Sequence, residues 1–81
     1  MNDHLVKILI DTAFFLEFSD ESQVNLDVSI QMLESMAAEL QLMSTKDKLL
    51  LIKKIEKISE EYSQPYRNFV KNLSLNFGII E

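Results

Sequence analysis

The sequence predicts an all-α protein, a small four-helix antiparallel bundle built as a single domain over residues 1–81. Apolar residues recur at steps of three and four through most of the chain, which is the periodicity of amphipathic helices. One glycine and one proline among 81 residues leave little material for the tight turns of β-hairpins. Hydrophobic residues form 47% of the chain, which favours a folded core over a disordered segment. The short connections between the expected helices favour antiparallel neighbours.

The first helix is expected over residues 3–18 and is apolar on nearly every side. Between Leu5 and Phe18 the polar residues are Lys7, Asp11, Thr12 and Glu17. A helix that is apolar all round lies either at the centre of a bundle or in contact with another chain. Because the other helices of a small domain do not easily enclose it, the pattern favours a homodimer that self-associates through Leu5, Ile8 and Phe15. A monomer whose flanking helices cover this helix is the alternative.

The second helix, expected over residues 26–43, has the broadest apolar face and is predicted to be the element around which the others pack. Its main stripe has helical spacing and consists of Leu26, Ile30, Leu33, Ala37 and Leu40. Three methionines widen this stripe: Met32, Met36 and Met43. Asn25 can serve as the N-cap, and Asp27 places a negative charge at the favourable end of the helix dipole.

The third helix is expected over residues 45–62, with Ser44 as its N-cap. Its predicted core face consists of Leu49, Ile52, Ile55, either Ile58 or Ser59, and Tyr62. Its lysines alternate with acids, which is the ordinary pattern of a solvated helix face.

The fourth helix is expected over residues 65–77. Pro65 suits the first turn of a helix, where its missing N–H would be unpaired in any case. The apolar stripe consists of Tyr66, Phe69, Val70, Leu73 and Phe77. Gly78, the one glycine, stands where a helix end favours a left-handed residue. Residues 79–81 either fold back onto the core or remain free.

The formal net charge of −5 is unevenly distributed. Residues 1–43 contain eight acids and a single base, Lys7, whereas residues 44–81 contain seven bases and five acids. An acidic first half repels phosphate backbones and attracts basic protein surfaces. The alternative interpretation is the solvated surface of an ordinary domain.

A helix pair joined at Ser44 could also suggest a DNA-binding helix-turn-helix. The basic residues of its second helix would be Lys53, Lys54 and Lys57, which are few for a recognition helix in a chain of net −5. We therefore expect no nucleic-acid partner.

Residues suited to catalysis form no recognisable pattern in this chain. It has no cysteine, and its one histidine, His4, lies beside the terminus. Asp20, Glu21 and Asp27 lack the alternating ligands and the central glycine of a calcium-binding EF-hand. There is no phosphate-binding glycine loop and no nucleophile motif. We expect a protein that is not an enzyme and that uses no cofactor and no metal.

The apolar runs of the chain are short. The longest, residues 13–16 and 49–52, fall far below the length of a membrane span. The first residues lack the basic region of a secretory signal. The sequence therefore predicts a cytoplasmic protein without a membrane partner.

Together these features favour a non-catalytic protein-binding module. One specific form is an acidic inhibitor, such as an immunity protein that blocks a basic toxin or nuclease. Its acidic partner-binding face would consist of Glu17, Asp20, Glu21, Asp27, Glu34 and Glu39. The alternative is a structural homodimeric helical adaptor in which the contact is formed by Leu5, Ile8, Phe15 and the methionines of the second helix.

The size, the acidity and the four expected helices are also similar to an acyl carrier protein. In that family the prosthetic arm is attached to a serine at the start of the second helix. The nearest serines here are Ser22 and Ser29, but neither stands in the Asp-Ser-Leu motif of the family and no glycine precedes either one. An acyl-carrier-like protein is therefore the second alternative.

Two segments of the first half resemble stretches of small uncharacterised bacterial proteins that are acidic and helical. These segments are residues 14–20, FFLEFSD, and residues 32–37, MLESMA. The resemblance brings no assigned activity with it.

Overall fold

A computed structural model describes residues 1–80, which form helices and no strand. The four helices are α1 (Asp3–Phe18), α2 (Leu26–Gln41), α3 (Thr45–Ser59) and α4 (Tyr66–Asn76). The predicted all-α class is confirmed. Within residues 1–80, none of the helices combines the length and the apolar character needed to cross a bilayer.

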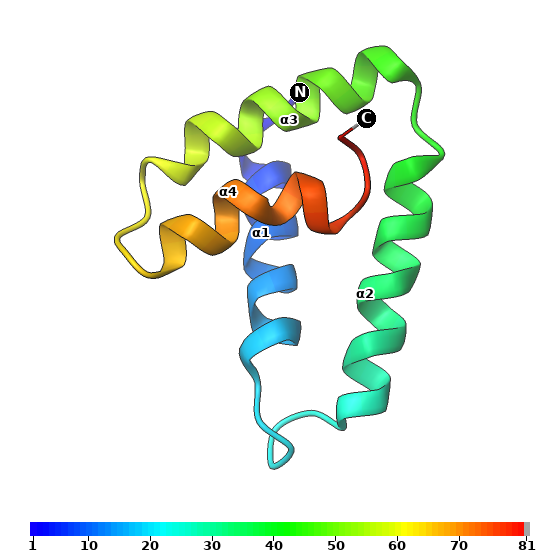
Figure 1. The fold of residues 1–81 in the computed structure, drawn as a ribbon, viewed down its shortest axis with the longest axis vertical. Helices are drawn as coiled ribbons and strands as arrows, with labels where there is room; N and C mark the ends of the chain where they lie inside the picture. Colours follow the sequence, from blue (N-terminus) through cyan, green and yellow to red (C-terminus); the bar gives the residue numbers. More distant parts are fainter. Residues whose placement is uncertain (81) are drawn as a thin grey trace.

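The helices form two antiparallel pairs rather than one aligned bundle. Figure 1 shows α1 and α2 running in opposite directions, joined at the lower end of the view. The pair of α3 and α4 lies across the upper part of this hairpin, so that the lower part of α1 and α2 projects beyond it. The predicted arrangement of four aligned antiparallel helices is therefore not confirmed.

The hydrophobic core is formed by α1, α3, α4 and the segment after α4. Its members are all less than 5% exposed and are Val6, Ile10, Ala13, Leu51, Ile55, Ile58, Val70, Leu73, Phe77 and Ile79. No residue of α2 belongs to this set, and the one fully buried residue of α2 is Ser29. Apolar residues of α2 instead pack partly buried against the edge of the core; they are Leu33, Met36, Ala37 and Leu40.

The prediction that residues 26–43 form the organising element is therefore wrong. A broad apolar face shows that a helix has surface to bury, but not that the rest of the chain supplies enough apolar surface to bury it. Here α3 and α4 pack mainly against each other and against α1, and α2 packs mainly against α1. The helix that packs against all three others is α1.

The buried face of α3 agrees with the predicted one except at its start: Ile55, Ile58 and Ser59 are buried, and Ile52 and Tyr62 pack partly buried against the core. Leu51 is buried, whereas Leu49 and Leu50 are exposed. Leu51 lies four residues before Ile55 and takes the core position that was predicted for Leu49. Because residues 49–52 are all apolar, periodicity alone does not select the strip that faces the core.

The helix ends follow local capping interactions. The Asn25 side chain accepts hydrogen bonds from the backbone N–H groups of Asp27 and Val28, at 2.9 and 3.3 Å. Ser44 Oγ accepts from the Asp47 N–H at 3.1 Å. Both predicted N-caps are confirmed. The far ends were predicted too long, because α2 ends at Gln41 and α3 at Ser59.

Gly78 ends α4 in the left-handed conformation, with a φ of +71°. Its N–H donates to the Leu75 carbonyl at 3.0 Å, and the Ile79 N–H donates to the Ser74 carbonyl at 3.1 Å. This pair of bonds is a Schellman motif, which satisfies two of the carbonyls at the helix end. The turn carries Ile79 back into the core, where it is buried.

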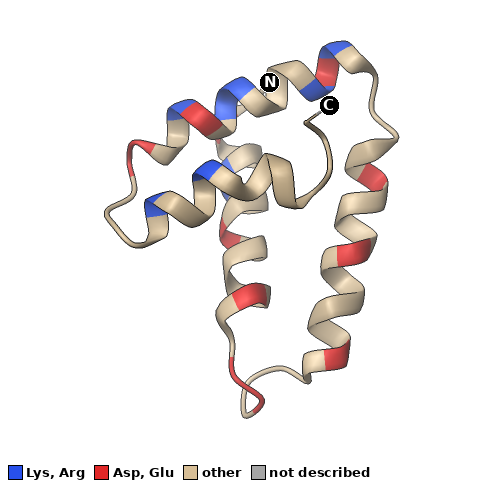
Figure 2. Ribbon diagram, viewed as in Figure 1, with Lys and Arg blue, Asp and Glu red and all other residues tan. Residues whose placement is uncertain are grey.

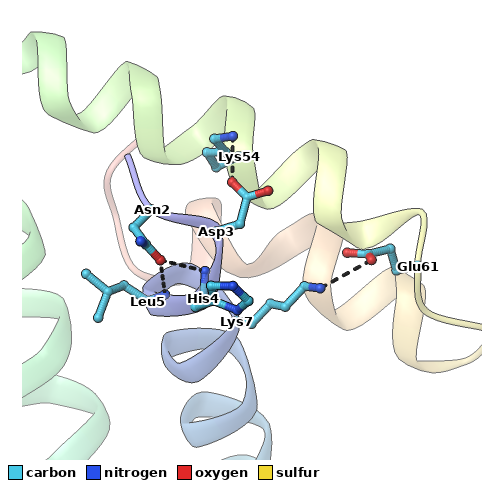
Figure 3. Close-up of polar contacts among 7 residues, drawn as sticks. All are labelled: Asn2, Asp3, His4, Leu5, Lys7, Lys54 and Glu61. Carbon is cyan, nitrogen blue, oxygen red and sulfur yellow. Dashed lines mark hydrogen bonds and ion pairs between the residues drawn. The ribbon is translucent and has the colours of Figure 1, made fainter.

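Polar contacts tie α1 to α3 and to the residues that follow it. Lys54 Nζ lies 2.6 Å from Asp3 Oδ1, and Lys7 Nζ lies 3.3 Å from Glu61 Oε1 (Figure 3). The hydrogen bond from Lys54 lowers the pKa of the Asp3 carboxyl. Figure 3 also shows Asn2 capping α1, with its side-chain oxygen accepting from the backbone N–H groups of His4 and Leu5. The fold thus uses Asp3 and Glu61, which lie outside the predicted acidic face.

Candidate protein-binding surface

Six acidic residues lie on the hairpin of α1 and α2, and all of them are exposed. Figure 2 shows the acidic positions along the lower part of α1, the α1–α2 connection and the length of α2. The residues of this acidic surface are the predicted Glu17, Asp20, Glu21, Asp27, Glu34 and Glu39. Within residues 1–80, the ion pairs are those of Asp3 and Glu61, and none uses an acid of this surface.

The basic residues lie on the other side of the molecule. Apart from Lys7, every lysine and arginine belongs to α3 or α4 (Figure 2). Residues 11–43 contain seven acids and no lysine or arginine. A groove between α3 and α4 is lined by both lysines and acids. These residues are Lys53, Glu56, Lys57, Glu60 and Lys71. The acidic surface therefore presents a negative field, and a field of one sign attracts surfaces of the opposite charge.

Two acids of this surface also have a local structural role. Asp20 Oδ1 accepts hydrogen bonds from the hydroxyl and the backbone N–H of Ser22, and these bonds lower the pKa of the Asp20 carboxyl. Asp27 stands in the first turn of α2, where its charge stabilises the helix. Glu34 and Glu39 form no side-chain hydrogen bond or ion pair within residues 1–80, so their charges are available to a partner without loss of a fold contact.

The three residues predicted for self-association are all exposed. The exposed fractions of Leu5, Ile8 and Phe15 are 66%, 62% and 50%. Helical spacing places Ile8 and Phe15 on the side of α1 opposite the buried Ile10 and Ala13. The helix is therefore divided between a strip that belongs to the core and an apolar strip that faces solvent.

A cleft between α1, α2 and α4 was not anticipated from the sequence. It has a volume of about 270 Å³ and is lined by Glu17, Leu33, Phe69, Leu73, Asn76 and Phe77. Leu33, Phe69, Leu73 and Phe77 give it apolar walls, and Glu17 and Asn76 add polar groups. The sequence alone does not indicate this cleft, because the residues that line it beside Glu17 come from α2 and from α4 and its C-cap.

An aromatic cluster adjoins the cleft. The ring of Phe14 lies 4.7 Å from that of Phe18, 5.0 Å from that of Tyr66 and 5.8 Å from that of Phe69, measured between centroids. The rings of Phe18 and Phe69 are 5.2 Å apart, and Phe18 is exposed. Since Phe69 also lines the cleft, apolar surface continues from the cleft to solvent at Phe18.

The serines considered for a prosthetic arm lie in different environments. Ser29 is buried in α2 and is closed to a carrier arm in this conformation. Ser22 is exposed in the α1–α2 connection, but its hydroxyl is hydrogen-bonded to Asp20. Within residues 1–80, no three side chains of His, Cys, Asp or Glu are grouped closely enough to hold a metal ion.

Comparison of the chain with protein-family models, with curated proteins and with solved structures finds no match.

Proposed function

We propose that this chain is a non-catalytic protein-binding module of the cytoplasm whose acidic surface docks onto a basic partner. The observation that carries the proposal is the set of exposed carboxylates, unpaired within the fold, on a part of the chain without bases. One specific form is an acidic inhibitor that blocks a basic toxin or nuclease, as an immunity protein does. In that form the carboxylates occupy the surface on which the enzyme would bind the phosphates of its substrate.

The physical consequence of such recognition is an association that depends on salt. Exposed charges are screened over about 8 Å at physiological ionic strength, so steering by the acidic surface weakens as salt is added. Contacts between apolar residues become stronger as salt is added, or change little. Salt therefore separates recognition by the acidic surface from an apolar contact.

The test is a pull-down from a lysate of the source organism at low and at high salt, with the wild type and two charge-reversed variants. The first variant carries Glu34→Lys and Glu39→Lys, which reverse acids of the acidic surface that have no structural contact. The control variant carries Glu56→Lys and Glu60→Lys, which change the net charge equally but lie on α3 and at its C-cap.

We expect a basic protein to be recovered by the wild type and the control at low salt and lost at high salt. The variant of the acidic surface should recover about tenfold less of it, since steering by charge acts over this range. Equal recovery by both variants would contradict the proposal, because the location of the charge would then be irrelevant. The mass of the bait itself is read in the same experiment, and a phosphopantetheine-sized increase would instead establish a carrier protein.

A homodimeric adaptor is the second candidate, and the exposure of Leu5, Ile8 and Phe15 favours it. Analytical ultracentrifugation over a range of concentrations tests this function with the double variant Leu5→Ser and Ile8→Ser. The dimer should persist at high salt in the wild type and be lost in the variant. A wild type that sediments as a monomer at all concentrations would exclude it.

A further inference from the structure

The apolar stripe of α2 is covered at one end and uncovered at the other. Leu33 and Leu40 are partly buried against the core, whereas Leu26 and Ile30 are 56% and 45% exposed. Leu26, Ile30 and Leu33 share one face of the helix, because they are separated by steps of four and three. The difference between the two ends follows from the projection of the hairpin of α1 and α2 beyond α3 and α4 (Figure 1).

The uncovered end of the stripe leads into the cleft. Leu33 lines the cleft together with Phe69 and Phe77 of the opposite wall. Along α2, Ile30 is about 4.5 Å and Leu26 about 10 Å from Leu33, at about 1.5 Å per residue. The cleft and the stripe therefore form one apolar track of about two helical turns.

Acidic side chains border this track along its length. Glu17 belongs to the lining of the cleft itself. At the far end, Leu26 shares a surface depression with Glu21 and Asp27. Glu34 is exposed beside Leu33 on α2. The track thus combines an apolar floor with acidic neighbours, and no lysine or arginine lines the cleft or this depression.

We infer that this track binds a basic amphipathic helix of the partner. A helix with large apolar side chains at helical spacing and lysine or arginine beside them complements an apolar floor with acidic edges. The volume of the cleft suits one or two such apolar side chains. Residues 1–80 contain no strand and so offer no sheet edge to which a partner strand could be added. The inference rests on the proposed function, since it specifies the chemistry of the same basic partner.

The experiment uses synthetic peptides as probes of the whole chain. The first is a helical peptide of about 18 residues, five turns long, with leucine on one face and lysine on the other. A scrambled peptide of identical composition keeps the charge but removes the periodicity. Calorimetric titration should show that the helical peptide binds about tenfold or more tightly than the scrambled one. Its binding should also shift the NMR signals of Phe69 and Phe77.

Two variants separate the apolar floor from the charge. The double variant Leu26→Gln and Ile30→Gln removes exposed apolar groups of the track without changing the net charge. The matched control, Leu49→Gln and Leu75→Gln, removes exposed leucines of α3 and α4. We expect the first variant to lose about tenfold or more in affinity for the helical peptide and the control to stay within about twofold. Thermal unfolding of both variants checks that the fold is retained.

Three results would overturn the inference. Equal affinity for the helical and the scrambled peptide would mean recognition by charge alone, which leaves the proposed function intact. Binding of neither peptide, at low salt, would overturn the inference, and a pull-down without a basic partner would then reject the proposed function as well. A wild-type dimer that is lost in the Leu26→Gln, Ile30→Gln variant would assign the track to a second copy of the chain instead.

Discussion

At Gly78 the local conformation and the packing of α4 depend on one hydrogen atom in place of a side chain. The φ of +71° is costly for other residues, and a Cβ at this position would lie 2.8 Å from Gln41 Nε2. That same nitrogen donates to the Phe77 carbonyl at 2.8 Å and thereby links the end of α2 to the end of α4. A side chain at position 78 would disturb both the turn and this link.

We therefore expect Gly78→Ala to lower the free energy of unfolding by about 1–3 kcal/mol, the range for a strained backbone position. Urea unfolding followed by circular dichroism measures this change. Asn76→Ala, at an exposed position two residues earlier at the end of α4, serves as the control and should change the stability by less than about 0.5 kcal/mol. An unchanged midpoint for Gly78→Ala would contradict the assigned role of the left-handed turn.

The Tyr62 hydroxyl donates to Asp11 Oδ1 at 2.9 Å. Burial of the phenol, followed by its hydrogen bond to Asp11 and the nearby carboxylate charges, raises the pKa of Tyr62 to about 12. An unfolded tyrosine ionises near a pKa of about 10. Because the folded state holds this proton more tightly, its contribution to stability is complete below pH 10 and is lost as the pH rises toward 12.

In a Tyr66→Phe background, ultraviolet absorbance follows the ionisation of Tyr62 alone. We expect a midpoint near pH 12 and a lower midpoint when Asp11→Asn removes the neighbouring charge. A midpoint that Asp11→Asn leaves in place would show that the charge of Asp11 does not raise the pKa of Tyr62.

At the scale of single helices, α4 gives the sharpest contrast between a buried and an exposed side. Leu73 is 2% exposed, and Leu75, two residues later, is 62% exposed. Leu73→Ala should destabilise the fold by about 2–5 kcal/mol, since it leaves a cavity in the core. Leu75→Ala should have an effect within about 0.5 kcal/mol. Urea unfolding compares the two, and similar losses would mean that α4 does not face the core as described.

The partial cover of α2 has a consequence for its local stability. Its first turns contribute Ser29 alone to the buried residues, whereas α3 and α4 contribute several apolar residues each. Local opening costs less where few apolar contacts must be broken. Native-state hydrogen exchange should therefore protect the amides of residues 30–32 about tenfold or more weakly than those of Ile55 and Val70. Equal protection would indicate that α2 opens only with the whole fold.

The helix caps were predictable because they depend on neighbours in the sequence. Asn25 and Ser44 bond to N–H groups within three residues, and Gly78 adopts its conformation for a reason local to the helix end. Most of the core face of α3 was predictable from its spacing, but the choice between Leu49 and Leu51 was not, because it depends on where α1 and α4 lie. The peripheral place of α2 was missed for the same reason.

Some features of the candidate site were likewise predictable from the sequence, and others were not. Exposure of acids such as Glu34 follows from their charge, and the structure agrees with that expectation. The cleft does not follow from any one segment, since Glu17, Leu33 and Phe69 come from three helices. An apolar stripe on α2 was visible, but only its packing shows that Leu26 and Ile30 remain uncovered.

At the scale of the whole molecule, two helix pairs carry opposite electrostatic character. The hairpin of α1 and α2 holds the unpaired acids of the acidic surface, and α3 and α4 hold nearly all the bases (Figure 2). Such separation concentrates a negative field on one part of the surface and orients an approaching basic partner toward it. We therefore predict that the acidic surface governs the rate of encounter with a basic partner, and that the apolar track adds affinity after contact.

Recognition through the acidic surface is tested most directly by one measurement. It is the rate at which the purified chain associates with the basic partner recovered in the pull-down, followed as a function of ionic strength. We expect the rate of the wild type and of the Glu56→Lys, Glu60→Lys control to fall steeply with added salt, by about tenfold or more. For the Glu34→Lys, Glu39→Lys variant, the rate should be lower at low salt and less sensitive to salt. A wild-type rate that is the same at low and high salt would contradict recognition through the acidic surface.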